Sequence, residues 1–189
     1  MLIRHAVAAV DASACAAIYR PFVQFSVASL EERPPTANEF AGRIERTSRR
    51  YPWLVATLDG EVIGYAYASE HRERAAYRWA ADVAVYVSGT HHRRGAGRAL
   101  YAALLPLLGR QGLHVACAGI TLPNEASVAL HQAFGFTGVG IYRRIGWKAG
   151  AWRDVGWWEL ELLEPAGDGP PPEPGPPARL EAPPTRRAG

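Results

Sequence analysis

Apolar and polar positions along this chain follow two periods, one typical of strands and the other of helices. Runs rich in β-branched and aromatic residues indicate strands, and apolar residues three and four positions apart indicate amphipathic helices. The pattern predicts strands over residues 2–6, 53–58, 61–69, 79–87, 114–121, 137–144 and 154–163. It predicts helices over residues 11–20, after Pro35, and over residues 95–111 and 124–133. The expected order of elements is therefore βααβββαβαββ.

Turn and cap residues set the limits of several of these elements. Thr36 and Glu39 form a capping-box sequence, which predicts the start of the second helix. Asp59-Gly60 is a dipeptide that favours positive φ, and it joins two strands in a predicted hairpin. Gly135 follows the last helix at the position where a left-handed residue commonly ends one.

The C-terminal stretch differs in composition from the rest of the chain. Residues 165–189 hold nine of the 15 prolines and show no apolar periodicity. Because proline removes backbone donors and the stretch has little to bury, it is expected to be a disordered tail. The sequence thus predicts one domain over residues 1–164 and a tail over residues 165–189.

A glycine-containing turn between a strand and a helix is the strongest functional signal. The strand ending at Val87 leads into His91, His92, Arg93 and Arg94, and Gly95-Ala96-Gly97-Arg98 then opens a helix. Unpaired N–H groups, the helix dipole and the arginines all favour an anion there. This pattern predicts a site for a pyrophosphate.

Two common nucleotide motifs do not fit this turn. A Walker loop needs Lys followed by Ser or Thr after its last glycine, but Arg98-Ala99 follows Gly97. A dinucleotide fingerprint needs a small residue at position 100, which is Leu100, and an acidic residue about twenty positions on. The remaining pattern, Gln/Arg-x-x-Gly-x-Gly/Ala, is similar to the acyl-CoA loop of the GNAT acetyltransferases, with His92 in the first position.

Four further segments occur in the order found in one branch of that family. The chain closely resembles the phosphinothricin-type N-acetyltransferases over roughly residues 2–163, on the segments YPWLVA (51–56), AYRW and DVAVYV (76–87), GITLPNEASVALHQAFGF (119–136) and GWKAGAWRDVGWW (146–158). The resemblance implies an α+β fold with a mixed, mostly antiparallel sheet and helices on both faces. It also implies an acetyl-CoA-dependent N-acetyltransferase that forms a homodimer.

The resemblance assigns the residues that bind acetyl-CoA. Backbone groups of the strand that ends at Val87 are expected to bind the pantetheine arm, and the loop after this strand is expected to bind the pyrophosphate. The start of the helix at Asn124 is expected to face the cofactor. The assigned residues are Val85, Tyr86, Val87, Arg93, Arg94, Gly95, Ala96, Gly97, Arg98, Asn124 and Ser127. Asn124 is also a reasonable N-cap.

Two residues are candidates for proton transfer. Asp82 stands where the family has its catalytic Glu, inside an apolar run where an unpaired carboxylate is costly. The Asp side chain reaches on the order of 1.5 Å less far than that of Glu. Asp82 could therefore act on the amine directly or through a water molecule, or it could only pair with a local group. His131 could protonate the leaving CoA thiolate or assist the base, or it could be a satisfied histidine on a half-buried helix.

The acceptor site is the part that the resemblance defines least. Arg74 and Tyr77 match family positions associated with the acceptor, although a surface Arg is an equal alternative, and Leu30 lies in the first acceptor loop. The family substrates are phosphinothricin and methionine sulfoximine. Acetylation of another primary amine and a non-catalytic acyl-CoA sensor are the two alternatives.

Composition narrows the list of partners. The formal net charge is +3, and the arginines at positions 43–50 alternate with glutamates on a helix, so nucleic-acid binding is not expected. No apolar run has the length of a membrane span, which predicts a cytoplasmic protein. Neither Cys15 nor Cys117 has a partner at metal-binding spacing, so both are interpreted as core residues and no metal is expected.

Overall fold

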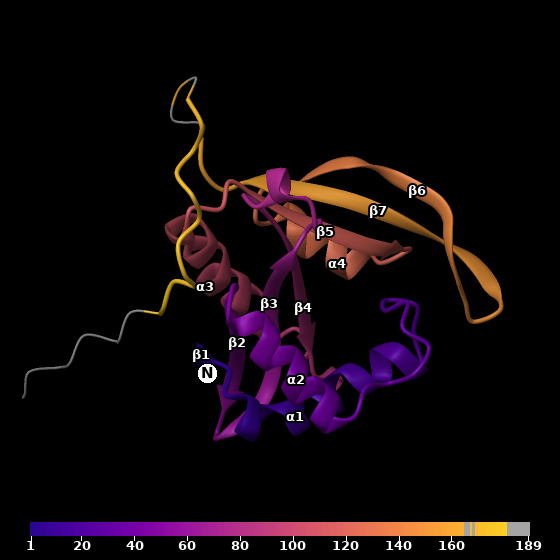
Figure 1. The fold of residues 1–189 in the computed structure, drawn as a ribbon. Coiled ribbons are helices and arrows are strands. Elements are labelled where there is room, and N and C mark those ends of the chain that lie inside the picture. The colour runs from indigo at the N-terminus through magenta and orange to yellow at the C-terminus, as the bar shows by residue number, and fades with distance from the viewer. Residues whose placement is uncertain (165–166, 168, 181–189) are drawn as a thin grey trace, which may run out of the picture.

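A seven-stranded sheet with the order β1-β2-β3-β4-β5-β7-β6 forms the centre of the molecule (Figure 1). The computed structural model describes residues 1–164, 167 and 169–180. All strand pairs are antiparallel except β4–β5, which is parallel. The strands are β1 (Leu2–His5), β2 (Trp53–Leu58), β3 (Glu61–Glu70), β4 (Ala80–Val87), β5 (Val115–Leu122), β6 (Thr137–Lys148) and β7 (Ala151–Glu161).

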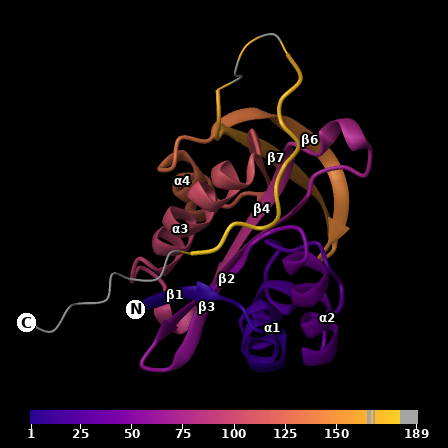
Figure 2. The same ribbon diagram turned by 60° about the vertical axis from the view of Figure 1, so that its left-hand side comes forward.

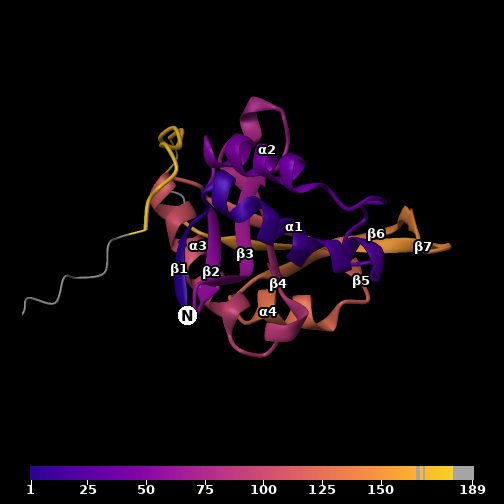
Figure 3. The same cartoon turned by 90° about the horizontal axis from the view of Figure 1, so that it is seen from below.

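Helices cover both faces of the sheet, as Figure 3 shows from below. On one face α1 (Ala8–Gln24) and α2 (Ala37–Ser48) bury Cys15, Tyr19 and Phe40 against aromatic residues of β2 and β3. On the other face lie α3 (Ala96–Gln111) and α4 (Glu125–Gln132), and α3 buries a row of leucines against the same strands. The predicted α+β architecture and the order of its elements are confirmed.

Most of the local signals act as predicted. Thr36 Oγ1 accepts from the Glu39 N–H at 3.2 Å, and the Glu39 carboxylate accepts from the Thr36 N–H at 2.7 Å. In the β2–β3 turn Asp59 and Gly60 have φ values of 52° and 87°. Gly135, with φ of 88°, follows the last turn of α4. The start of α2, the β2–β3 turn and the end of α4 therefore form through chemistry that the sequence encodes locally.

The closing hairpin is longer than predicted. The sequence pattern indicated strands over residues 137–144 and 154–163, but β6 and β7 extend to a turn at Ala149-Gly150. All residues from 137 to 145 are exposed, so no apolar–polar alternation marks the middle of β6. Figure 1 shows the hairpin arching away from the sheet toward the loop that follows α1.

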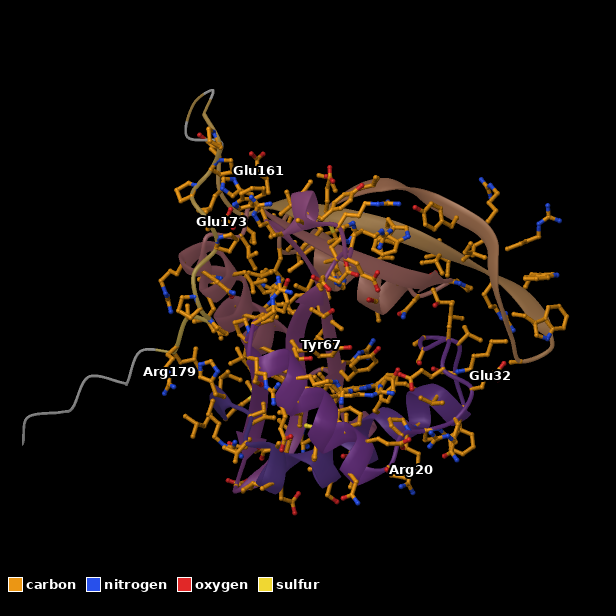
Figure 4. The ribbon with its side chains drawn as sticks, viewed as in Figure 1. Arg20, Glu32, Tyr67, Glu161, Glu173 and Arg179 are labelled. Carbon is orange, nitrogen blue, oxygen red and sulfur yellow. The ribbon has the colours of Figure 1, made fainter. Side chains whose placement is uncertain are left out.

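The expectation of a disordered tail does not hold for residues 169–180. This segment returns from the end of β7 along the molecule toward the N-terminus (Figures 2 and 4). Ala178 and Leu180 pack against the core under α3. Its polar contacts join Glu173 to Arg78, Pro172 to Trp79, Gly175 to Gln111, Arg179 to Arg110 and Leu180 to His5.

No sequence pattern predicted this docking, because these contacts do not depend on periodic apolar residues. The Trp79 indole N–H donates to the Pro172 carbonyl at 2.8 Å, and the Gly175 N–H donates to the Gln111 carbonyl at 2.7 Å. A proline-rich chain keeps its carbonyl acceptors, so it can pair with side chains and helix ends outside a strand ladder. The rest of the predicted tail, residues 165–166, 168 and 181–189, lies outside the described residues.

Ending the chain at Glu164 should lower the melting temperature by several degrees. Removal of the segment exposes apolar core surface around Leu180 and leaves His5 and Trp79 without their partners. Apolar burial on this scale is worth on the order of 1–2 kcal/mol, which for a domain of this size corresponds to roughly 2–8 °C. Thermal unfolding of the two chains provides the measurement, and equal melting temperatures would show that the segment does not dock in solution.

Candidate active site

The sheet opens where β4 and β5 stop pairing. Their register covers Ala80, Ala81 and Asp82 opposite Val115, Ala116 and Cys117, whereas β4 continues to Val87. The backbone of residues 83–87 on the side toward β5 therefore has no strand partner. A cavity of about 780 Å³ lies at this opening, between β4, the start of α3, the start of α4 and the end of α1. Unpaired strand amides beside a cavity can bind the amide groups of an extended ligand.

The loop between β4 and α3 closes one end of this cavity. Gly95 is the residue before α3 and adopts the left-handed conformation with φ of 79°, so the first N–H groups of α3 are free of helix bonds. Arg93 and Arg98 line the cavity beside it, whereas Arg94 does not. The His92 ring bonds the Val87 carbonyl at 3.1 Å and thereby ties the loop to the strand. Positive charge and free N–H groups make this end suited to a pyrophosphate.

The start of α4 forms the facing wall. Asn124 caps the helix by accepting from the Ser127 N–H at 3.2 Å, as its sequence position predicts. His131 is 3% exposed and bonds through both ring nitrogens: Nδ1–H donates to the Ser127 carbonyl at 2.7 Å, and Nε2 accepts from the Tyr101 hydroxyl at 2.9 Å. Burial lowers the pKa of His131. Both ring nitrogens of His131 therefore have hydrogen-bond partners, and burial favours the neutral ring.

The cavity gathers most of the residues that the sequence assigned to acetyl-CoA. Those lining it are Val85, Tyr86, Val87, Arg93, Gly95, Ala96, Gly97, Arg98, Asn124 and Ser127, and the catalytic candidate His131 lines it as well. Arg94 and Asp82 are outside its lining, as are Arg74, Tyr77 and Leu30. The residues expected to bind the cofactor and those expected to bind the acceptor therefore occupy different parts of the molecule.

Asp82 lies just beyond the cavity, at the last position of β4 that pairs with β5. Because side chains alternate along a strand, it shares a face with Ala84 and Tyr86, which line the cavity. Its carboxylate accepts from the His71 ring at 2.6 Å, through Nδ1. Burial raises the pKa of Asp82, whereas the bond and charge of His71 and the charge of Arg72 lower it. His71 was not among the residues singled out from the sequence, since it lies in a charged turn with no motif.

Cys117 completes the group of polar atoms around Asp82. One ligand-type atom each from His71, Asp82 and Cys117 lie within 4.8 Å of one another. Burial raises the pKa of the Cys117 thiol to about 11, and the nearby Asp82 charge acts in the same direction. Cys117 is therefore a neutral, half-buried thiol at the site, whereas Cys15 is a core residue as predicted.

The first acceptor loop is tied to the β6–β7 hairpin. Lys148 donates to the Glu31 carbonyl at 2.8 Å, and Leu30 packs against Gly146 of β6. Glu31, the next residue of this loop, accepts a bidentate pair from Arg43 at 2.7 and 2.9 Å. Its negative charge is thus offset. The loop and the hairpin tip lie together at one side of the molecule, where Glu32 is labelled in Figure 4.

The turn between β3 and β4 holds the other two acceptor candidates. Tyr77 is 45% exposed, and its ring lies 5.9 Å from that of His71, centroid to centroid. Arg74 precedes the short helical turn at Ala75–Tyr77 and is exposed. The structure therefore brings Tyr77 close to Asp82 through His71, while Arg74 lies farther out on the same turn.

Comparison with known proteins identifies the family. The model of the acetyltransferase (GNAT) domain matches residues 5–157. The chain is 42% identical to the phosphinothricin N-acetyltransferase of Streptomyces viridochromogenes over 164 residues, which is 87% of this chain and 89% of that one. It is 36% identical to an L-methionine sulfoximine/L-methionine sulfone acetyltransferase of Salmonella typhimurium, over 82% of this chain and 92% of that one.

A solved structure agrees with these relatives. The phosphinothricin acetyltransferase from Sinorhizobium meliloti in complex with acetyl-CoA superposes with a TM-score of 0.84 at 37% identity, and the match covers 89% of this chain and 92% of that one. The chain therefore belongs to the GNAT acetyltransferase family. Within it, the chain is an acetyl-CoA-dependent N-acetyltransferase similar to the phosphinothricin acetyltransferases.

Replacing Gly97 with Val should weaken acetyl-CoA binding by at least about tenfold, or 1.4 kcal/mol. A Cβ at this position meets Leu130, Val87 and Val85 at 3.4–3.9 Å, which are ordinary contacts, so the fold should persist. The two further methyl groups of Val then occupy cavity space beside the first N–H groups of α3. Calorimetric titration with acetyl-CoA measures the change.

The matched control is Gly89→Val, because a Cβ at Gly89 meets nothing within 4 Å and Gly89 is outside the cavity lining. This variant should bind acetyl-CoA like the unaltered chain. Unchanged affinity in a folded Gly97→Val variant would place the pyrophosphate elsewhere.

Proposed function

We propose that the acetyl acceptor is the amino group of a small amino acid of the phosphinothricin or methionine sulfoximine type. The observation that carries this proposal is the position of Asp82. The carboxylate lies at the closed end of the β4–β5 opening, and Tyr77 lies near it through the ring of His71. The names of the relatives support the same substrate class.

Acetyl-CoA fits the opening by charge and shape. The first N–H groups of α3, with Arg93 and Arg98, hold the pyrophosphate, and the unpaired backbone of Val85, Tyr86 and Val87 holds the pantetheine arm. Ala96 and Gly97 leave room beside the pyrophosphate, and Arg94 steers the anion from outside the cavity. Asn124 and Ser127 contact the cofactor from α4. The cofactor supplies a thioester, whose carbonyl carbon is the electrophile.

Asp82 provides the basic half of the reaction. An amine is protonated near neutral pH and must lose a proton before it attacks the thioester. The ionised carboxylate drives that loss, and burial, which raises its pKa, moves its basicity toward the working pH. Because the base acts only when ionised, activity should be present above the pKa of Asp82 in the folded protein and decline as the pH falls through it.

His131 supplies the acidic half. The imidazole lines the cavity, and the proton that it can give to the thiolate is the one on Nδ1, which now rests on the Ser127 carbonyl. The ring regains a proton when the acceptor nitrogen releases its own. Arg74, Tyr77 and Leu30 form the acceptor subsite, in which Arg74 pairs with the α-carboxylate. Because Arg43 offsets Glu31, a second anionic group such as a phosphinate is tolerated.

The proposal extends to assembly and location. The exposed side chains of β6 include Val139, Ile141, Tyr142, Ile145 and Trp147, all at least 48% exposed. An apolar row of this kind suits a second copy of the chain, so a homodimer is proposed. In the part of the chain that the structure describes, no helix is long and apolar enough to cross a membrane. A cytoplasmic enzyme with no nucleic-acid, membrane or metal partner completes the proposal.

A panel of amines tests the proposed acceptor. Release of the CoA thiol is measured with methionine sulfoximine, phosphinothricin, a polyamine and a peptide N-terminus, each at the same concentration. The two amino acids should give the highest kcat/KM. A higher kcat/KM for the polyamine or the peptide would show that the acceptor belongs to that class instead. Binding of acetyl-CoA without turnover on any amine would favour a sensor.

Asp82→Asn should lower kcat by a factor of about 100 or more while acetyl-CoA binds nearly as before, since loss of a general base typically costs this much. The amide keeps the shape of the carboxylate but lacks its negative charge. Asp59→Asn, in the exposed β2–β3 turn, is the matched control and should keep full activity. If Asp82→Asn retains more than half of the turnover across the pH range, Asp82 is not part of the base.

A further inference from the structure

Asp82 does not face the acceptor alone, because its carboxylate is bonded to an imidazole. His71 Nδ1 and Asp82 Oδ1 are 2.6 Å apart, and the His71 side chain is 15% exposed. His71 directly follows β3, which pairs with the first part of β4 through Ser69 and Asp82. The pair therefore lies at the end of β4 opposite the loop of Gly95. In the proposed reaction the acceptor amine meets the thioester at this end.

The orientation of the imidazole follows from this bond. An ionised carboxylate accepts only, so Nδ1 carries the proton that it donates to Asp82. In the neutral ring Nε2 then has a free lone pair, and no hydrogen bond to Nε2 occurs among the described residues. A carboxylate that fixes the tautomer of a histidine is the arrangement that makes histidine a general base.

Neighbouring rings fix the direction of His71. Its ring meets those of Tyr77 and Trp157 edge to face, at 5.9 and 5.8 Å between centroids. The Trp157 ring covers Gly119, where a Cβ would meet it at 3.2 Å, and Gly119 lines the cavity. His71 is thus held between the exposed acceptor residue Tyr77 and the wall of the cofactor cavity.

We propose that His71 takes the proton from the acceptor amine, and that Asp82 orients the His71 imidazole and stabilises its protonated form. This inference rests on the proposed acetyltransferase function and assigns the base within it. The short side chain of Asp82 is explained, because the hydrogen bond and the width of the ring extend its reach. The sequence left open whether Asp82 contacts the amine directly or through a water molecule. In this proposal the proton passes through the His71 imidazole instead.

Protons and bonds balance in the transfer of the acetyl group from CoA to the amine. His71 Nε2 takes one proton from the ammonium group, which frees the lone pair on nitrogen. The nitrogen forms a bond to the thioester carbonyl carbon, and the C–S bond breaks with its electron pair on sulfur. The second proton leaves the nitrogen as the amide forms, and the thiolate gains one proton to give the free CoA thiol. The imidazolium, stabilised by Asp82, returns its proton to solvent.

Other titratable groups around the pair do not replace it. They are Arg72 from the same turn, Tyr67 from β3, Tyr51 before β2, Tyr77, Cys117 from β5 and Glu159 from β7. Burial raises the pKa values of Tyr67 and Cys117. Both groups therefore stay neutral, and neither gives up a proton that would neutralise the Asp82 carboxylate. A neutral Cys117 thiol is also a weak nucleophile, which agrees with direct transfer to the amine.

A double-mutant cycle tests the assignment. His71→Gln should lower kcat by about 100-fold or more, as expected for loss of a general base. The double variant His71→Gln/Asp82→Asn should fall within about threefold of the slower single variant, because residues that act as one unit are not additive. His114→Gln, a histidine outside the cluster, is the control and should keep full turnover.

The pH profile separates a base from a residue that only tunes Asp82. His71 lowers the pKa of Asp82, so its removal raises that pKa. If Asp82 were itself the base, His71→Gln would regain its full rate at higher pH, with only the acidic limb displaced. The proposal predicts a plateau that stays low at every pH. Recovery of the plateau, or independent effects that multiply in the double variant, would overturn it.

A spectroscopic measurement keeps the test independent of the acceptor. Two-bond ¹⁵N–¹H spectra of the full chain should show neutral His71 with its proton on Nδ1, and Asp82→Asn should remove that preference. A proton on Nε2 in the unaltered chain would overturn the proposal, since no lone pair would face the amine. Absence of turnover on every amine of the panel would reject the proposed function, while the spectrum would still decide the tautomer.

Discussion

The parallel pairing of β4 with β5 stops after three positions, and the rest of the site depends on that divergence. A strand that continues to Val87 beside an opening must leave backbone groups without a sheet partner, and such groups are costly unless they bind something. The family to which the chain belongs uses acetyl-CoA, whose pantetheine arm carries amides of its own. We propose that this interruption of the sheet binds the cofactor through backbone groups, for which no special side chain is required.

The same divergence separates the two halves of the chemistry. Anion-binding groups, with Gly95 and Arg98, gather after the last residue of β4, whereas Asp82 and His71 lie beside its first residues. Each end is fixed by its own neighbours: His92 ties the loop to Val87, and Tyr77 and Trp157 hold the ring of His71. In the proposed reaction the thioester reaches between these two ends, so the length of β4 sets the distance from the cofactor to the base.

Sequence reasoning predicted the features that depend on local chemistry. The capping box at Thr36, the Asp59-Gly60 turn and the glycine turn before α3 all encode their structure within a few residues. The pairing of His71 with Asp82 could not be predicted, because the two residues become neighbours only through the register of β3 with β4. A histidine within the mixed charges of the turn at 70–74 has no periodicity or spacing that distinguishes it.

Docking of residues 169–180 was missed for a related reason. Its contacts use carbonyl groups and two apolar side chains, which composition alone cannot distinguish from those of an unfolded segment. The length of β6 was underestimated because its middle faces solvent, where no core selects an alternating pattern. In both cases the missing information was a partner surface elsewhere in the fold.

If acetyl-CoA lies in the opening between β4 and β5, its addition should produce large shifts of the backbone amide resonances of residues 83–87 and 95–98 and of Ser127, with little change in β1 and β2. Shifts confined to other elements, or a response of the loop at Gly95 without any response in β4, would rule out this position of the cofactor.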